Sequence, residues 1–448
     1  MSFYYQPKNS WSRRTVIPKY HHRPRSIHFS SFGRFRRRIV AILVIILIYF
    51  FLKHLPAPPK TQNNVSANRP PPERDLDVYP HFLYRSTFRE YPDLEYEAKL
   101  EETLQQLELQ VLREEGEGDA NTIWQIMPTT ADRSPDSLAL EERNPQWRYR
   151  VATDDWAIDF VTNTLSSIPD LAALYKSYPY NVLRADLLRY LITWYYGGYY
   201  ADADVWPARP INACPSLQPL FNPPEHRRNI SLVLGVEIDE PYASKKLMRE
   251  WHWSRNYGFI QYSIYAPRRF SPLLRRAVVR VLAHTKQHND KSNWFTGPRY
   301  DEKTILEVTG PGVFTDAILD VLSETLPPTH PLIQTSVEAD AEIGDLLVPL
   351  ASKEKKRYKP ASISREDVVE RQARVTWAPF HQLKEPIWVD ATEAAEGKNM
   401  GGLGVLPVSV WGNGQRHSGA ENFRSSHACI NHRFGRTWKK GWWEYFFG

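Results

Sequence analysis

The hydrophobic pattern of this 448-residue chain begins with one long apolar run. Residues 39–52 are continuously apolar, and extension to residue 55 gives seventeen positions. A helix of that length is about 25 Å long, near the short limit for crossing a bilayer. A cleaved signal peptide is the alternative, but residues 56–60 lack the small-residue cleavage pattern. We therefore predict a transmembrane signal anchor at residues 39–55.

The charges around this run predict its orientation. Residues 1–38 carry ten Lys or Arg and no Asp or Glu, which predicts a cytosolic tail with everything after about residue 56 in the lumen. The net charge of +6 resides in this tail, so the remaining chain carries about 6 − 10 = −4 and nucleic-acid binding is disfavoured. Asn64 and Asn229 are candidate glycosylation sites on the lumenal side.

A stem is predicted over residues 56–118. Residues 56–75 are rich in Pro and Asn, and an acidic helical stretch follows at residues 92–114. Its apolar positions recur at spacings of four and three, at Leu100, Leu104, Leu107 and Val111. Such a seam permits self-association of the stem into a homo- or hetero-oligomer. Its shortness favours the alternative, a helix packed on the following domain.

Short apolar runs alternate with helical segments from residue 119 onward. This alternation predicts an α/β domain over residues 119–448. Residues 353–400 are polar and weakly periodic, so we expect an inserted loop there. The predicted strands are 122–127, 147–151, 198–205, 232–236 and 402–408, and the predicted helices are 184–195 and 273–284.

Composition adds two observations. The hydrophobic share of 42% can fill a large core, and the 13% aromatic share suits either core packing or sugar contacts. Cys214 and Cys429 are the only two cysteines. In an oxidising lumen they can pair, or both can remain buried free thiols, and the sequence leaves these alternatives open.

The chemistry is concentrated in residues 181–207. A helix, the Gly197-Gly198 break and an aromatic run lead to Asp202-Ala203-Asp204. On a regular strand, carboxylates at i and i+2 point to one face and can hold a divalent cation that also binds substrate phosphates. Such a cation would neutralise the diphosphate leaving group of a nucleotide-sugar. An isolated D-x-D also occurs in many surface turns, so the neighbouring residues matter.

Two blocks in this region, 184–190 (RADLLRY) and 197–204 (GGYYADAD), resemble the DXD region of glycosyltransferase family 32. That family contains the fungal initiation-type α-1,6-mannosyltransferases. The similarity extends in family order to 123–125 (IWQ), 144–149 with 153–155, 309–316 (TGPGVFTD) and 432–438 (HRFGRTW). The ending departs from the family pattern, with Arg433 in place of a second His and residues 435–437 altered.

The resemblance implies a GT-A fold, a Rossmann-like nucleotide-sugar-binding domain. Asp202 and Asp204 would hold Mn²⁺ and the diphosphate, with His432 as a third metal ligand. Asp186 and Arg189 would contact the donor sugar and its phosphate, and together with Asp204 they are the candidate catalytic residues. The structural alternative for Asp186 and Arg189 is a salt bridge within one helix, because residues at i and i+3 are neighbours.

The remaining site residues also follow from the resemblance. Trp124 would stack near the base, although a buried strand Trp serves a core equally well. Arg184 would bind the donor, and Thr437 and Trp438 would donate to the β-phosphate. The candidate acceptor loop comprises Gly310, Pro311 and Gly312.

The expected function is retaining, metal-dependent transfer of mannose from GDP-mannose to N-linked glycans of secretory glycoproteins by a Golgi type II membrane enzyme. No nucleophile is evident, so front-face transfer assisted by the leaving phosphate is our hypothesis. Glu237 and Asp239 are the nearest spare carboxylates for a base. One alternative acceptor is inositol phosphorylceramide, which the aromatic residues 442–447 favour because they could touch a membrane. The other alternative is a non-catalytic subunit of a mannosyltransferase complex.

Overall fold

The computed structural model describes residues 87–118, 120–223, 227–251, 253–292, 297–340 and 374–434. The chain divides into two compact units, residues 1–69 and 70–448, and every described residue belongs to the second. The predicted cytosolic tail, anchor 39–55 and Pro-rich stem lie outside the described residues, as do Asn64, Thr437 and Trp438. Among the helices that are described, none has the length and apolar character needed to cross a membrane.

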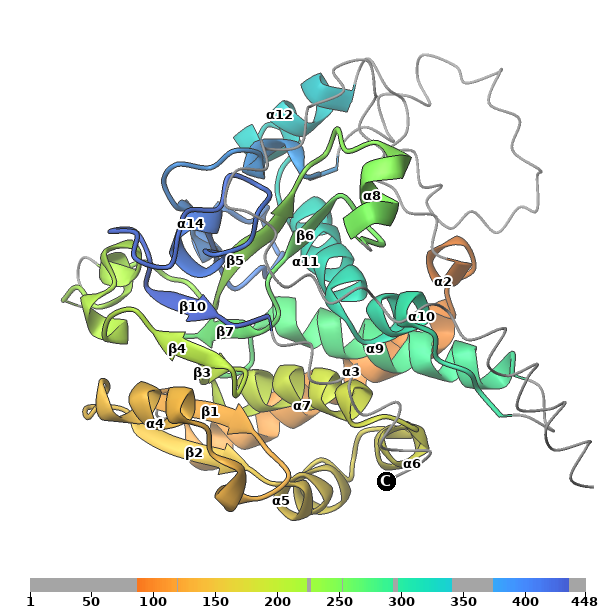
Figure 1. The fold of residues 1–448 in the computed structure, drawn as a ribbon. Coiled ribbons are helices and arrows are strands. Elements are labelled where there is room, and N and C mark those ends of the chain that lie inside the picture. The colour runs from red at the N-terminus through yellow and green to blue at the C-terminus, as the bar shows by residue number, and fades with distance from the viewer. Residues whose placement is uncertain are drawn as a thin grey trace, which may run out of the picture. The chain divides into compact units, whose positions relative to one another are not determined.

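An eight-stranded mixed sheet forms the centre of this unit (Figure 1). Its order is β2-β1-β3-β7-β5-β9-β8, with β6 beside β5. β1 is parallel to β2 and β3, and β7 is antiparallel to both β3 and β5, so β3 and β5 run in the same direction. The strands are β1 (Thr122–Ile126), β2 (Arg148–Ala152), β3 (Gly198–Ala201), β5 (Leu232–Asp239), β6 (Tyr257–Phe259), β7 (Ser263–Ala266), β8 (Ile387–Val389) and β9 (Leu403–Leu406).

Helices cover both faces of the sheet. Alternate strand residues point to opposite faces, and apolar side chains on both faces are buried. Trp124 and Tyr200 belong to the core on one face, whereas Ile123 and Tyr199 belong to the core on the other. The first core includes α7 (Asn181–Tyr196), α9 (Pro272–Asp290) and α11 (Pro311–Thr325). The second includes α4 (Pro135–Glu142) and α14 (Val408–Trp411). The predicted α/β architecture is confirmed.

Further helices and a small second sheet complete the unit. The other helices are α2 (Thr87–Glu90), α3 (Leu94–Glu115), α5 (Asp154–Asp159), α6 (Leu171–Ser177), α8 (Lys245–Trp251), α10 (Glu302–Val308) and α12 (Pro331–Asp340). A second sheet contains only β4 (Val205–Pro207) and β10 (Ile430–His432).

The helix that leads to the D-x-D sequence ends at a glycine for a physical reason. Gly197 follows α7 with φ 69°, and its N–H donates to the carbonyl of Thr193. Gly198 has φ 98°, and a Cβ there would lie 2.5 Å from the carbonyl oxygen of Thr122. Only glycine tolerates both the positive φ and this close approach. The two glycines therefore let β3 begin directly beside β1.

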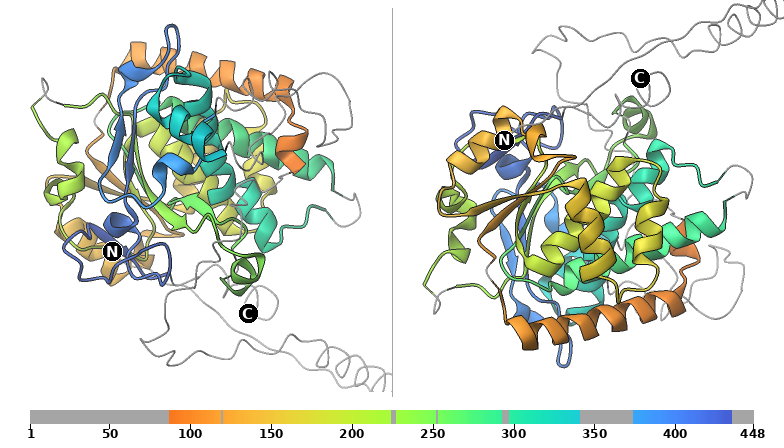
Figure 2. Two further views of the ribbon diagram at one scale, coloured as in Figure 1. Left: turned by 90° about the horizontal axis from the view of Figure 1, so that it is seen from above. Right: turned by 90° about the horizontal axis from the view of Figure 1, so that it is seen from below.

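The predicted helix at residues 92–114 is observed as α3, and it packs on the sheet domain. Leu100, Leu104 and Val111 are buried in the first core. Arg275 of α9 binds Glu101 and Glu108 of α3, at 2.6 Å each. Figure 2 shows α3 along one side of the helical layer in both views. Packing on the sheet domain, rather than self-association, therefore accounts for the apolar positions of α3. The helix lies in the same compact unit as the sheet.

Two strand predictions were wrong at their ends. The predicted strand 198–205 stops at Ala201, because Asp202 N–H donates to Tyr262 O and Val205 N–H donates to Asp202 O, which closes a turn. β4 then leaves the large sheet and pairs with β10. The predicted strand 402–408 ends at Leu406, because Pro407 caps α14.

The predicted inserted loop 353–400 contains regular structure in the part that is described. Residues 387–389 form β8, the antiparallel partner of β9. Trp388 packs so closely that a Cβ on Gly404 would lie 2.4 Å from its ring. A three-residue strand is too short to produce a detectable alternation, which explains why the sequence indicated a loop here. Residues 353–373 lie outside the described residues.

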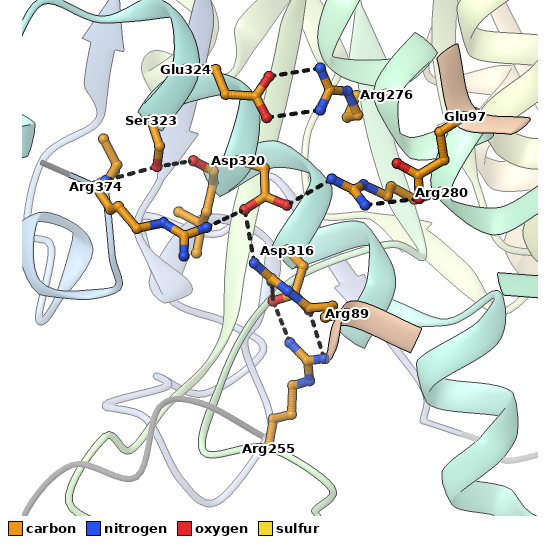
Figure 3. A network of polar contacts seen from close by, with 12 residues as sticks. Arg89, Glu97, Arg255, Arg276, Arg280, Asp316, Asp320, Ser323, Glu324 and Arg374 are labelled. Carbon is orange, nitrogen blue, oxygen red and sulfur yellow. Dashed lines mark hydrogen bonds and ion pairs between the residues drawn. The ribbon is translucent and has the colours of Figure 1, made fainter. Parts of the chain in front are cut away.

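A buried charge network joins α2 and α11 to the loop before β6 (Figure 3). Arg89 binds Asp316 and Asp320 at 2.8 and 2.9 Å, and Arg255 binds Asp316 at 2.6 Å. Burial alone would raise the pKa of Asp316, but Arg255 and Arg89 outweigh burial and hold this pKa well below its usual range. Removal of one partner from such a group leaves a buried charge uncompensated.

We predict that Asp316→Asn lowers the free energy of unfolding by roughly 3–5 kcal/mol at pH 7. The matched control is Glu324→Gln, because Glu324 pairs with Arg276 but has 49% of its side chain exposed. An exposed pair contributes under about 1 kcal/mol. Urea unfolding of the purified variants measures both values, and equal losses would contradict the prediction.

The deficit of Asp316→Asn should also depend on pH. The folded-state pKa of Asp316 is depressed, so its stabilisation is present above the unfolded-state pKa of about 3.9 and is lost as the pH falls below it. The difference between wild type and Asp316→Asn should therefore shrink between pH 5 and pH 3. A difference that stays constant over this range would show that the carboxylate charge is not its source.

Candidate active site

The Asp202–Asp204 turn lies at the carboxyl end of β3 and is held through its backbone. Gln125 Nε2 of β1 donates to Asp202 O at 3.0 Å, and Ser134 Oγ before α4 donates to Ala203 O at 2.7 Å. The backbone is therefore immobilised while both carboxylates stay accessible, with 27% and 29% of their side chains exposed. The aspartates are brought together by a turn, not by alternation along one strand.

His432 reaches this turn from the distant end of the chain. β10 pairs antiparallel with β4, which places His432 opposite Val205. The imidazole stacks on Tyr262 with ring centroids 4.1 Å apart, and its Nε2 lies 3.0 Å from Asp204 Oδ1. One ligand atom from each of Asp202, Asp204 and His432 lies within 4.8 Å of the other two. Two carboxylates and an imidazole fit a divalent cation of the Mn²⁺ type.

A disulfide stabilises the strand pair that carries His432. Cys214 and Cys429 are bonded, with Cα atoms 5.5 Å apart and a sequence separation of 215. Cys429 lies three residues before His432, and its carbonyl accepts from the backbone N–H of Ala208, just after β4. Of the two alternatives left open by the sequence, the structure contains the pair.

Asp186 and Arg189 form both the predicted helical salt bridge and a contact with the Asp202–Asp204 turn. Arg189 Nη2 lies 3.1 Å from Asp186 and 3.5 Å from Asp202, so the guanidinium links α7 to the turn. Asp186 is 1% exposed and accepts from Thr309 Oγ1 at 2.8 Å. Burial raises the pKa of Asp186, while Arg189 and the Thr309 hydrogen bond oppose the rise.

The two spare carboxylates near the end of β5 have different environments. Asp239 is 5% exposed and binds His381 Nδ1 and the backbone N–H of Gln382, both at 2.6 Å, so it is engaged structurally. Glu237 is half-buried beside the turn. Burial raises its pKa to about 7, with Asp202 adding to the rise and His432 and Arg189 opposing it. Glu237 is therefore the carboxylate that shares the electrostatic environment of the site.

Other predicted residues lie further from the turn or in packed surroundings. Trp124 is 3% exposed and packs against Trp156 and Tyr196, with ring centroids at 5.6 and 5.2 Å, so core packing accounts for it. Arg184 donates to Tyr178 O and Asn181 Oδ1. Its role in donor binding stays a prediction.

The predicted acceptor loop is a helix junction. Gly310 caps α11 and Pro311 and Gly312 begin it, while Cβ atoms on the two glycines would lie 2.7 and 2.8 Å from Leu306. Glycine is needed here because α10 and α11 approach closely. Asn229 is exposed, which is compatible with its predicted glycosylation, and its backbone N–H donates to Asp390.

Several residues that shape the site were not predicted from the sequence. The Gln261 side chain accepts a hydrogen bond from Tyr190 Oη and donates one to Asp186. Its backbone carbonyl oxygen accepts a hydrogen bond from Arg189. The ring of Tyr262 stacks on the imidazole of His432. Arg433, which departs from the family pattern, pairs through two nitrogens with Asp136 at the start of α4. A Gln inside the apolar run 257–266 is the one signal that could have indicated Gln261.

Residues 136–220 match the family described as "Glycosyltransferase sugar-binding region containing DXD motif". This chain is a glycosyltransferase, and residues 136–220 carry its DXD sugar-binding region. The match includes α7 and the Asp202–Asp204 turn, and it confirms the resemblance inferred from the sequence.

Three relatives extend the comparison of this glycosyltransferase. It is 24% identical over 415 residues to an initiation-specific alpha-1,6-mannosyltransferase of Candida albicans, covering 90% of this chain and 93% of that protein. It is 30% identical over 234 residues to one from Schizosaccharomyces pombe, covering 50% and 54%. An inositol phosphoceramide mannosyltransferase 3 of Schizosaccharomyces pombe is 31% identical over 122 residues, covering 26% and 32%.

We predict that His432→Gln weakens Mn²⁺ binding to this glycosyltransferase at least about tenfold, because it removes the nitrogen beside Asp204. His427→Gln is the control, since His427 has 64% of its side chain exposed and pairs with Glu421. Calorimetric titration of the purified protein with Mn²⁺ measures the effect. Unchanged affinity in His432→Gln would remove this residue from the metal site.

We also predict that Cys214→Ser with Cys429→Ser lowers stability by roughly 2–5 kcal/mol, because the bond closes a long loop. Affinity for Mn²⁺ should fall as well, since β10 carries His432. Thermal unfolding and Mn²⁺ titration, each with and without reductant, measure the two effects. Reductant should change wild type but not the double variant, and equal responses would contradict the assignment.

Proposed function

We propose that this glycosyltransferase has a GT-A fold and transfers mannose from GDP-mannose to N-linked glycans of secretory glycoproteins, with retention at the anomeric carbon. The observation that carries the proposal is the convergence of Asp202, Asp204 and His432 beside the buried Asp186–Arg189 pair. The mannosyltransferase names of the relatives support the sugar. The GDP base and the N-glycan acceptor extend the family resemblance.

The residues have separable roles in this proposal. A divalent cation at Asp202, Asp204 and His432 would neutralise charge on the diphosphate leaving group. Arg189 holds its positive charge against Asp202 and orients the turn for the donor. The family resemblance assigns Asp186 to the donor sugar. Its carboxylate is buried, held by Thr309 and Gln261, and positions Arg189 beside the turn.

The transfer step balances without a protein nucleophile. The bond between the anomeric carbon and the diphosphate oxygen breaks, and the acceptor hydroxyl oxygen forms the new bond on the same face. Its proton passes to the leaving diphosphate. Arg189 and the immobilised turn need no rearrangement as charge develops, which is how preorganised dipoles lower a barrier.

The cellular setting we propose is the Golgi lumen, with residues 39–55 as a type II anchor. The Cys214–Cys429 bond supports this setting, because disulfides persist in oxidising compartments.

Two alternative functions are transfer to a lipid acceptor and a non-catalytic role in a mannosyltransferase complex. The inositol phosphoceramide relative favours a lipid acceptor, although it matches only 26% of this chain. A non-catalytic subunit has no chemical need for the intact charge set of Asp186, Arg189, Asp202 and Asp204. We therefore favour the glycoprotein acceptor and a catalytic chain.

The proposed function predicts mannose transfer by the purified chain with GDP-mannose, a mannose-rich oligosaccharide and Mn²⁺. Chelator should abolish transfer, and Asp204→Ala should lower kcat/KM at least about 100-fold. Glu324→Gln is the control and should retain wild-type rates. Product analysis by mass spectrometry and NMR reports the sugar transferred and its anomeric configuration.

Other outcomes would discriminate among the functions. Transfer to inositol phosphorylceramide but not to glycans would replace the proposed acceptor. Absence of turnover with every nucleotide-sugar, in a folded protein, would sink the catalytic role and favour the subunit function.

A further inference from the structure

Two half-buried indoles stack on each other where the chain leaves α8. The rings of Trp251 and Trp253 are stacked, with centroids 5.6 Å apart and planes 23° apart. The imidazole of His417 meets both rings edge-on, with centroids at 5.2 and 4.6 Å. We call these three side chains the indole platform. Burial lowers the pKa of His417 to about 4, so the platform is uncharged at neutral pH.

One connection joins the platform to Glu237. Gln415 Nε2 donates to Glu237 O at 2.9 Å, and His417 follows two residues later, within about 7 Å of chain. The next residue, Ser418, accepts from Asp239 N–H at 2.8 Å and donates its own N–H to Glu240 at 2.6 Å. The loop that carries His417 is therefore attached to the carboxyl end of β5, where Glu237 lies beside the Asp202–Asp204 turn.

A second connection joins the platform to Asp186. Arg255 follows Trp253 by two residues and binds Glu307 at 2.9 Å through Nε, besides its contact with Asp316. Glu307 lies near the end of α10, and Thr309 two residues later donates to Asp186 at 2.8 Å. Two independent connections thus run from the platform to the donor site, and they end at different carboxylates.

We propose that the indole platform binds a hexose ring of the acceptor glycan. This inference rests on the proposed function and adds the place where that acceptor binds. The axial C–H groups of a pyranose form an apolar face that matches a flat aromatic surface, and the hydroxyls around its rim remain solvated. Trp supplies large rigid contact area at a low cost in conformational entropy. The buried network of Figure 3 holds Arg255, two residues after Trp253, so the chain next to the platform is anchored before a ligand binds.

The location also distinguishes the two substrates. The phosphates and sugar of the donor are assigned to Asp186, Arg189 and the turn, whereas the platform offers aromatic surface without a charged side chain of its own. An uncharged hexose of a glycan fits that chemistry. The platform lies at the carboxyl edge of the sheet, where ligands of open α/β sheets bind.

The test compares Trp253→Ala and Trp251→Ala with the ring-conserving Trp253→Phe. The matched control is Trp388→Ala, because Trp388 is a half-buried indole on β8, the end strand separated from β5 by β9. Initial rates are measured over ranges of mannose-rich oligosaccharide and GDP-mannose, and oligosaccharide binding is measured by calorimetry without donor. Thermal unfolding verifies that each variant is folded.

We expect the ratio of acceptor KM to donor KM to rise at least about tenfold in Trp253→Ala, in line with loss of a central aromatic anchor. Oligosaccharide affinity should fall by a similar factor, Trp253→Phe should recover most of it, and Trp388→Ala should match wild type. If wild type transfers mannose but Trp251→Ala and Trp253→Ala leave the KM ratio unchanged, the platform is not the acceptor site. The proposed function would then still stand. Failure of wild type to transfer or to hydrolyse any donor would instead overturn the proposed function.

Discussion

The convergence of four carboxylates is the constraint on which this site depends. Asp186, Asp202, Asp204 and Glu237 come from three elements and share one partly desolvated edge of the sheet. Like charges at such range raise each other's pKa and oppose folding unless cations offset them. Arg189 lies between two of the four, at 3.1 and 3.5 Å, and is itself 5% exposed. The carboxylates outnumber the single Arg189 cation, and a divalent cation held by Asp202, Asp204 and His432 would supply further positive charge.

Local patterns predicted much of this arrangement. The alternation of strands and helices, the glycine break after α7 and the residue types around Asp202 are short-range features, and the structure and the family match agree with them. The turn between Asp202 and Asp204 could not be predicted, because a two-residue spacing suits a strand as well as a turn. Gln261 and Tyr262 reach the site only because β7 inserts between β3 and β5, a pairing that no local pattern encodes.

The segment that composition assigned to a stem has a larger structural role. Arg89 of α2 and Arg255 share the carboxylate of Asp316, so a helix before the sheet domain helps to fix the loop that follows α8. α3 adds Glu108, which binds both Arg275 and the indole nitrogen of Trp194 at the core of α7 and α9. Both elements therefore stabilise the helical layer from which Asp186 and Arg189 project. A boundary at residue 118, where the predicted stem ends, would separate both helices from the sheet domain on which they pack.

The pairing of β10 with β4 has a consequence for biosynthesis. His432 lies 228 residues after Asp204. Because translation adds about 5–20 residues per second, a ribosome makes the histidine roughly 10–45 s after the aspartate. During that interval a nascent chain can form its first parallel strands but cannot complete the metal-ligand set, and oxidation of Cys214 must await Cys429. The metal-ligand set is therefore completed late in synthesis, and a chain truncated before β10 lacks the histidine ligand.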